Sequence, residues 1–197
     1  MAKTVDYYYA LASPWSYLGH ERFREIVART GAEARFMPVE VPVLFPAMGT
    51  LSLKDRPESR KKNRLAELAR WHAHLDIPLN LQPKHFPVPD GPAAGMVIAA
   101  QEGGDDGAAL SGAFMRAVWA EERDIADQAT LDAIAAAEGH DGPALRAAAE
   151  TDAVRDRYRA NTEAAMASNV FGVPAWVIDG EMFWGQDRLD FVERALG

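Results

Sequence analysis

Residues 4–19 read TVDYYYALASPWSYLG, and the change of pattern within this stretch decides the fold. Its first half is rich in aromatic and β-branched side chains, which is typical of a β-strand. Ser13 and Pro14 then suit the cap and the first residue of a helix, and apolar side chains recur at helical spacing as far as Val27. A second strand-like run covers residues 34–39, so this end of the chain predicts a parallel βαβ unit.

The C-terminal end returns to strand-like sequence. Residues 175–178 and 181–184 read AWVI and EMFW, and the dipeptide Asp179-Gly180 between them is a strong hairpin signal. The helical spacing of the last apolar residues predicts a final helix after Gly185. The order at this end is therefore strand, strand, helix.

The middle of the chain carries amphipathic patterns that predict helices almost throughout. Without it, the remainder is the βαβ…ββα order of thioredoxin. We therefore expect an α/β, thioredoxin-like fold with a large all-helical insertion. The expected division is a thioredoxin-like domain over residues 1–44 and 169–197, and a helical insertion domain over residues 45–168.

Composition narrows the function classes. The chain has 197 residues, of which 48% are hydrophobic, and its formal net charge is -8. An acidic chain repels phosphate backbones, so nucleic acid is not an expected partner. The sequence has no apolar run of about 20 residues and no leader-like start, so we expect a cytoplasmic protein without a membrane span. His72 and His74 are two residues apart and point to different faces of a helix, so no metal site is expected.

The chain contains no cysteine, and this absence matters most at residues 13–16, which read SPWS. In thioredoxin-like oxidoreductases a Cys-x-x-Cys pair stands between the first strand and the first helix, where the helix end stabilises a thiolate. With Ser13 and Ser16 in those places, dithiol redox chemistry is excluded. Ser13 is either a helix cap alone or also a hydrogen-bond donor to a thiolate that comes from a ligand.

Two further motifs suit a peptide ligand. In thioredoxin-like folds a proline in the place of Pro174 is cis, and the residue before it, here Val173, offers its backbone to an extended peptide. The simpler interpretation is a proline that starts a strand. Gln186 and Asp187 lie at a helix start, where Asp187 either binds the α-ammonium of a γ-glutamyl group or only answers the helix dipole.

With these motifs the chain resembles the 2-hydroxychromene-2-carboxylate isomerases, which are grouped with the kappa-class glutathione transferases and the bacterial disulfide-bond oxidoreductases. The resemblance rests on residues 13–19 (SPWSYLG), 171–174 (FGVP) and 184–189 (WGQDRL), and it extends over nearly the whole chain. One departure is Asn63, which stands where family members usually carry a tyrosine at the start of the first insertion helix.

The resemblance implies a glutathione-dependent isomerase that acts on 2-hydroxychromene-2-carboxylate, or a similar unsaturated aromatic acid, by reversible thiolate addition. It also implies glutathione as the cofactor and a homodimer. Ser13 would orient the thiol, and the glutathione contacts would come from Val173, Pro174, Trp184, Gln186, Asp187 and Arg188. A carboxylate would be held by basic residues near the first insertion helix, namely Lys54, Arg60 and Lys61.

Two alternatives remain open at this point. A kappa-type transferase would form a stable glutathione adduct instead of releasing glutathione. A non-catalytic thioredoxin-like module would bind a peptide or a partner protein and carry out no chemistry.

Overall fold

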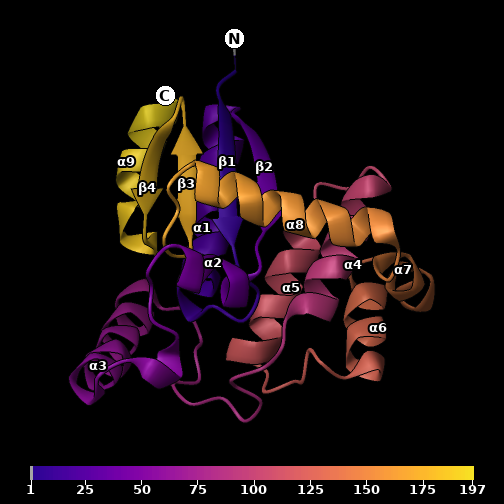
Figure 1. The fold of residues 1–197 in the computed structure, drawn as a ribbon, viewed down its shortest axis with the longest axis horizontal. Coiled ribbons are helices and arrows are strands. Elements are labelled where there is room, and N and C mark those ends of the chain that lie inside the picture. The colour runs from indigo at the N-terminus through magenta and orange to yellow at the C-terminus, as the bar shows by residue number, and fades with distance from the viewer. Residues whose placement is uncertain (1) are drawn as a thin grey trace.

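The computed structural model describes residues 2–197 and contains one four-stranded sheet with the strand order β2-β1-β3-β4. The strands β1 (Thr4–Tyr9) and β2 (Glu33–Pro38) are parallel. The strand β3 (Ala175–Ile178) runs antiparallel to β1, and β4 (Glu181–Trp184) runs antiparallel to β3. This arrangement, in which a parallel βαβ unit is joined by a hairpin, confirms the predicted thioredoxin-like fold class (Figure 1).

Helices cover both faces of the sheet. The helices α1 (Pro14–Thr30) and α9 (Leu189–Leu196) pack against one face, whereas α8 (Asp152–Ala167) crosses the other (Figure 1). The side chains of successive strand residues point to opposite faces of the sheet, so Tyr7 and Tyr8 belong to different hydrophobic clusters. Both faces of the central strand are thus buried, which explains its run of consecutive apolar side chains.

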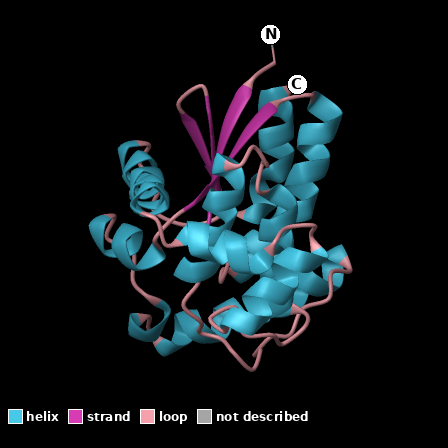
Figure 2. Ribbon diagram, turned by 90° about the vertical axis from the view of Figure 1, so that its right-hand side faces the viewer, coloured by secondary structure: helices cyan, strands magenta, loops and turns pink. Residues whose placement is uncertain are grey.

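The residues between β2 and β3 contain no strand. Figure 2 shows the strands at one end of the molecule and most of the helices gathered at the other. In chain order the segments after β2 are α2 (Val41–Ala47), the 3-10 turn η1 (Leu53–Asp55), α3 (Glu58–Leu75), α4 (Gly91–Glu102), α5 (Ala108–Trp119), α6 (Gln128–Ala137), α7 (Gly142–Ala149) and α8. A second 3-10 turn, η2 (Gln186–Arg188), joins β4 to α9.

Two of these helices were not apparent from the sequence. The helix α2 contains two prolines, one near its start and one inside it. The helix α4 begins within the proline-rich link, with Pro92 in its first turn. Residues 93–100 of α4 are all buried, so this helix has no polar face and shows no amphipathic period.

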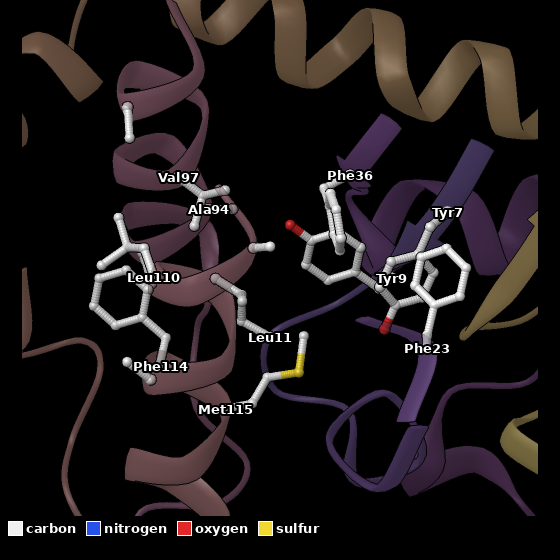
Figure 3. Close-up of a cluster of buried hydrophobic side chains, with 14 of the residues drawn as sticks. Tyr7, Tyr9, Leu11, Phe23, Phe36, Ala94, Val97, Leu110, Phe114 and Met115 are labelled. Carbon is white, nitrogen blue, oxygen red and sulfur yellow. The ribbon is translucent and has the colours of Figure 1, made fainter. Parts of the chain in front are cut away.

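The thioredoxin-like part and the helical insertion share one hydrophobic core. Figure 3 shows Leu11 next to Met115, between the aromatic group that contains Phe36 and Phe23 and the helix residues such as Leu110. The same cluster contains Tyr7, Tyr9, Trp176, Val97, Phe114 and Trp119. The Tyr7 ring stacks on Tyr9 at 4.6 Å and on Trp176 at 5.3 Å, and such pairs contribute about 0.5–1.5 kcal/mol beyond their buried area. The helices α4, α5 and α6 therefore pack on the frame through the side of the sheet that α1 also covers, whereas α8 packs on the opposite side.

The hairpin between β3 and β4 has the predicted geometry. Asp179 and Gly180 both have positive φ, 51° and 84°, as a two-residue type I′ turn requires. Within residues 2–197, no helix combines the length and the apolar character that a bilayer crossing needs.

Candidate active site

Ser13 is the N-terminal cap of α1. The Ser13 Oγ accepts a hydrogen bond from the backbone N–H of Ser16 at 3.2 Å, and Ser13 is half-buried. A hydroxyl oxygen that accepts a hydrogen bond keeps its own hydrogen free to donate. The first turn of α1 contains no acidic residue, so the positive end of the helix is not neutralised there. Ser13 can therefore cap the helix and donate to a ligand anion at the same time.

Ser16, in the second cysteine position, has a different environment. Its side chain is fully buried, and its Oγ lies 3.5 Å from the backbone nitrogen of Ala10. Ser13 is also tied to Ala10, because the Ser13 N–H donates to the Ala10 carbonyl at 3.1 Å. The loop between β1 and α1 is thus fixed from inside by Ser16, and only Ser13 can meet a ligand.

The Val173–Pro174 bond is cis, as the thioredoxin-like arrangement predicts. Strand β3 pairs with β1 in a register that places Tyr8 opposite Ala175, and continuing this register brings Val173 opposite Ala10. Val173 and Ala10 also belong to one buried cluster. Val173 is buried, and no hydrogen bond within residues 2–197 uses its N–H or C=O, so both groups keep their capacity to pair with an added strand.

The residues around the cis-proline are held closely by their neighbours. A methyl group placed on Gly172 would lie 2.5 Å from Nε1 of Trp184, so a glycine is required at this approach. The Trp184 ring also packs on Phe171 at 4.8 Å and remains 50% exposed. On the other side, the Thr50 hydroxyl donates to the Phe171 carbonyl at 2.6 Å. Thr50 belongs to the insertion, which therefore helps to position the cis-proline loop.

The third motif meets the first two. The Gly185 N–H donates to the Pro174 carbonyl at 2.9 Å, which joins the end of β4 to the cis-proline. Gln186 is buried against Gly19 of α1, where an added methyl group would lie 3.0 Å from the Gln186 Cβ. Its Oε1 accepts the Arg22 guanidinium at 2.6 Å. Gln186 thus anchors η2 on α1, a structural role that the sequence did not predict.

Asp187 and Arg188 are exposed beside this anchor. Arg188 Nη1 lies 2.7 Å from Asp187 Oδ2, in an ion pair between adjacent residues. Such exposed pairs are worth little, about 0–1 kcal/mol, so a ligand ammonium can compete for the Asp187 carboxylate. Ser13, Val173 and Asp187 therefore belong to three segments that contact one another around the start of α1.

Asp90, which the sequence did not single out, contacts the Ser13 loop directly. Its Oδ2 accepts the Ala12 N–H at 3.0 Å, across a large separation in the chain. Burial raises the pKa of the Asp90 carboxyl, and the N–H groups of Ala12, Asp90 and Leu11 lower it in part. Asp90 immediately precedes the first residue of α4, so this carboxyl links the insertion to the loop that carries Ser13.

The three predicted basic residues lie at the beginning of the insertion. Lys54 is in η1 and Arg60 is in the first turn of α3, and both are exposed. Lys61 Nζ lies 4.0 Å from Glu58 Oε2. Arg64, one turn further along α3, is half-buried and was not predicted. Burial and, to a smaller extent, the nearby Arg56 charge lower the pKa of Arg64 to about 10.

Two cavities lie elsewhere. One of about 410 Å³ is bounded by β2, α4 and α8, with Phe36, Gln101 and Asn161 in its wall. A smaller one of about 130 Å³ lies between α1 and α5, beside Tyr17 and His20. No predicted site residue lines either of them. At the Ser13 site, Ser13 is half-buried and Trp184 is 50% exposed beside the cis-proline.

A thioredoxin frame with a cis-proline beside the start of α1 defines the class of this protein. The family model described as the DSBA-like thioredoxin domain matches residues 4–197, and the chain belongs to this family.

Within it, the chain belongs to the 2-hydroxychromene-2-carboxylate isomerases. It is 32% identical over 197 residues to the 2-hydroxychromene-2-carboxylate isomerase of Sphingobium xenophagum, and the alignment covers 100% of this chain and 99% of that protein. The enzyme of the same name from Pseudomonas putida is 30% identical over 200 residues, and the alignment covers 98% of this chain and 94% of that enzyme. A solved 2-hydroxychromene-2-carboxylate isomerase, in selenomethionine form, superposes with a TM-score of 0.83 at 28% identity, over 98% of this chain and 94% of that chain.

Proposed function

We propose that this protein is a glutathione-dependent isomerase of 2-hydroxychromene-2-carboxylate or of a similar unsaturated aromatic acid. The observation that carries the proposal is that the loop carrying Ser13 and the cis-proline segment carrying Val173 both adjoin Ala10, in a chain that has no cysteine. Ser13 has a hydroxyl hydrogen to spare at the positive end of α1, and Val173 has an unpaired backbone beside it. These groups suit a cysteine-containing peptide whose thiol replaces the missing protein thiol.

The proposed contacts cover the peptide backbone and the γ-glutamyl ammonium of glutathione. The Val173 N–H and C=O would pair with the peptide backbone, as in an added strand. The Asp187 carboxylate would accept the γ-glutamyl ammonium, with Gln186 holding the turn in place through Arg22. Pro174, Trp184 and Arg188 would border the peptide. Bound glutathione would supply a thiol that adds reversibly to an unsaturated carbon.

Ser13 would act on the charge of that thiol. A free thiol has a pKa of about 8.5, and one pKa unit corresponds to about 1.4 kcal/mol. A hydroxyl donor and a helix end together contribute about 1–3 kcal/mol, which lowers the pKa by about 1–2 units. The Ser13 hydroxyl and the start of α1 would therefore raise the thiolate fraction of the bound thiol at neutral pH by about tenfold.

The proposal is tested by an isomerase assay with 2-hydroxychromene-2-carboxylate, monitored by absorbance and mass spectrometry. We expect turnover only with glutathione, no turnover with S-methylglutathione, and recovery of glutathione unchanged. A stable adduct of acid and glutathione would instead indicate a transferase. Turnover without glutathione would refute the proposal. The absence of glutathione binding in calorimetry would also refute it and would favour a non-catalytic module.

A further inference from the structure

The guanidinium of Arg64 lies on an aromatic surface. Its Cζ is 5.4 Å from the centre of the Phe86 ring and 5.9 Å from that of Trp119. These rings come from the link before α4 and from the end of α5, and they contact each other at 4.8 Å. Stacking on the two rings restricts the orientation of the guanidinium and leaves its N–H groups as directed donors.

The charged groups that influence this guanidinium are basic. Within residues 2–197 no carboxylate forms an ion pair with Arg64, and the one charged group that influences its pKa is Arg56. Arg56 is also affected by burial and by a like charge, because Arg60 lowers its pKa too. A partly desolvated cation among like charges gains more from an incoming anion than an exposed cation does, because water screens the latter.

Arg64 lies at the end of the molecule where α1 begins. The link between α3 and α4 passes along this end, where the Tyr17 hydroxyl donates to the Pro78 carbonyl at 2.8 Å. The same link reaches Asp90, whose carboxyl holds the Ala12 N–H at 3.0 Å. Phe86 and Asp90 are four residues apart in the sequence. A fully extended chain of four residues spans at most about 14 Å, so the Cα atoms of Phe86 and Asp90 lie within that distance of each other. Figure 1 shows α3 and the link at the end opposite the two termini, the end to which β1 points.

We propose that Arg64, assisted by Arg56, binds a carboxylate of the ligand whose reacting end lies at Ser13. The inference deepens the proposed function and rests on it. The γ-glutamyl carboxylate of glutathione would lie near Asp187 with its ammonium. Two other carboxylates remain as candidates, the glycyl carboxylate of glutathione and that of the unsaturated aromatic acid, and both present the same planar anion to the guanidinium. Arg64 differs from the sequence-predicted Lys54 and Lys61, because Lys54 is exposed and Lys61 already faces Glu58.

The experiment is calorimetry with three probes: glutathione, chromone-2-carboxylate and the uncharged chromone-2-carboxamide. The variants are Arg64→Gln and, as the matched control, Arg70→Gln. Arg70 lies on the same helix, is exposed and pairs with Glu67. Loss of a charge-assisted bidentate contact is expected to weaken binding at least about tenfold. Arg70→Gln is expected to leave all three affinities unchanged, and the carboxamide is expected to bind wild type and Arg64→Gln equally.

The affected probe identifies the carboxylate. A tenfold loss for chromone-2-carboxylate alone supports the site and assigns it to the acid, whereas a loss for glutathione alone supports it and assigns it to the glycyl end. Equal affinities of wild type and Arg64→Gln for both anions overturn the assignment, and so does the absence of anion binding by wild type. If wild type binds chromone-2-carboxylate but not glutathione, the proposed function fails. The Arg64 site is then still tested by the affinities of wild type and Arg64→Gln for chromone-2-carboxylate.

Two further variants guard against misfolding of Arg64→Gln, which uncovers part of an aromatic surface. Arg64→Lys keeps the charge but lacks the planar fork, and a smaller loss of anion affinity is expected. Arg56→Gln leaves the aromatic contact intact and is expected to weaken the same probe as Arg64→Gln. Wild-type affinity in both variants would contradict the proposal.

Discussion

Ser13 and Ser16 are joined by a hydrogen bond at the place where thioredoxin-like oxidoreductases carry a pair of cysteines. The Ser13 Oγ accepts the Ser16 N–H at 3.2 Å, while the Ser16 hydroxyl is buried and directed to the backbone of Ala10. The two serines are therefore not equivalent: Ser16 is buried and fixes the loop, whereas Ser13 is half-buried at the start of α1.

This difference predicts distinct thiol reactivities. The Ser13→Cys thiol lies half-exposed at a helix N-terminus, so it is expected to be alkylated rapidly by iodoacetamide at neutral pH. The Ser16→Cys thiol is enclosed in the core and is expected to react at least about tenfold more slowly. Mass spectrometry of the time course measures both rates. Equal rates would contradict the assigned orientation of the loop, and neither single variant is expected to show dithiol oxidoreductase activity.

Gly172→Ala tests the contact between the cis-proline loop and Trp184. The added methyl group would lie 2.5 Å from the Trp184 Nε1, so loop or ring must move. We expect the free energy of unfolding to fall by about 1–3 kcal/mol, measured by urea denaturation, together with weaker glutathione binding. Gly91→Ala is the matched control, because a methyl group there meets no atom within 4 Å. Equal stabilities of the two variants would refute the steric argument.

Asp90→Asn tests the carboxyl that holds the Ser13 loop. Burial raises the folded-state pKa of Asp90 above its ordinary 3.8, so the folded protein binds the proton more tightly than the unfolded chain. This contribution to stability is fully present below about pH 4 and is lost as the pH rises towards the folded-state pKa. The asparagine variant should gain stability relative to wild type across that window, in urea titrations at several pH values. A pH-independent difference would contradict the prediction.

His20 gives a pH dependence of the opposite sign. Its Nε2 lies 2.8 Å from the Ala108 carbonyl and must donate to it, while its buried Nδ1 has no partner among residues 2–197. Burial therefore lowers the pKa of His20 below 6.5. The His20 imidazole therefore binds a proton more weakly in the folded protein than in the unfolded chain. Its contribution to the free energy of unfolding is present above about pH 6.5 and is lost as the pH falls towards the folded-state pKa.

The measurement is the free energy of unfolding between pH 7 and pH 5 for wild type, His20→Gln and His74→Gln. His20→Gln is expected to be less stable at neutral pH, because it disturbs a packed aromatic cluster, but to have a flatter profile. His74 is exposed on α3, and its substitution is expected to leave the profile unchanged. A profile for His20→Gln as steep as that of wild type would contradict the assigned role of His20.

The frame of the fold could be predicted because its signals are local. The strand, cap and proline at residues 4–14 and the turn at Asp179-Gly180 each specify a backbone shape within a few residues. The helix α4 could not be predicted, because it is buried on all sides and starts among prolines. Periodicity detects a boundary between core and water, and α4 has none.

The candidate site was predictable only in part, for the same physical reason. Ser13 and the Val173–Pro174 bond follow from motif and position. The roles of Asp90 and Arg64 arise from contacts with residues distant in the chain, namely Ala12, Phe86 and Trp119. The sequence signal available for them was weak: an aspartate before Gly-Pro, and one arginine among several basic residues of a helix.

In the proposed function, the Ser13 hydroxyl stabilises a thiolate supplied by glutathione. This role of Ser13 is tested most directly by the pKa of the bound glutathione thiol, followed by ultraviolet thiolate absorbance in wild type, Ser13→Ala and Thr151→Ala. Thr151 is the N-cap of α8, with its Oγ1 3.5 Å from the Val154 nitrogen, and is thus a matched cap. Both variants are expected to lose about 1 kcal/mol of stability. Only Ser13→Ala is expected to raise the thiol pKa, by about one unit or more; an unchanged thiol pKa in this variant would contradict the account.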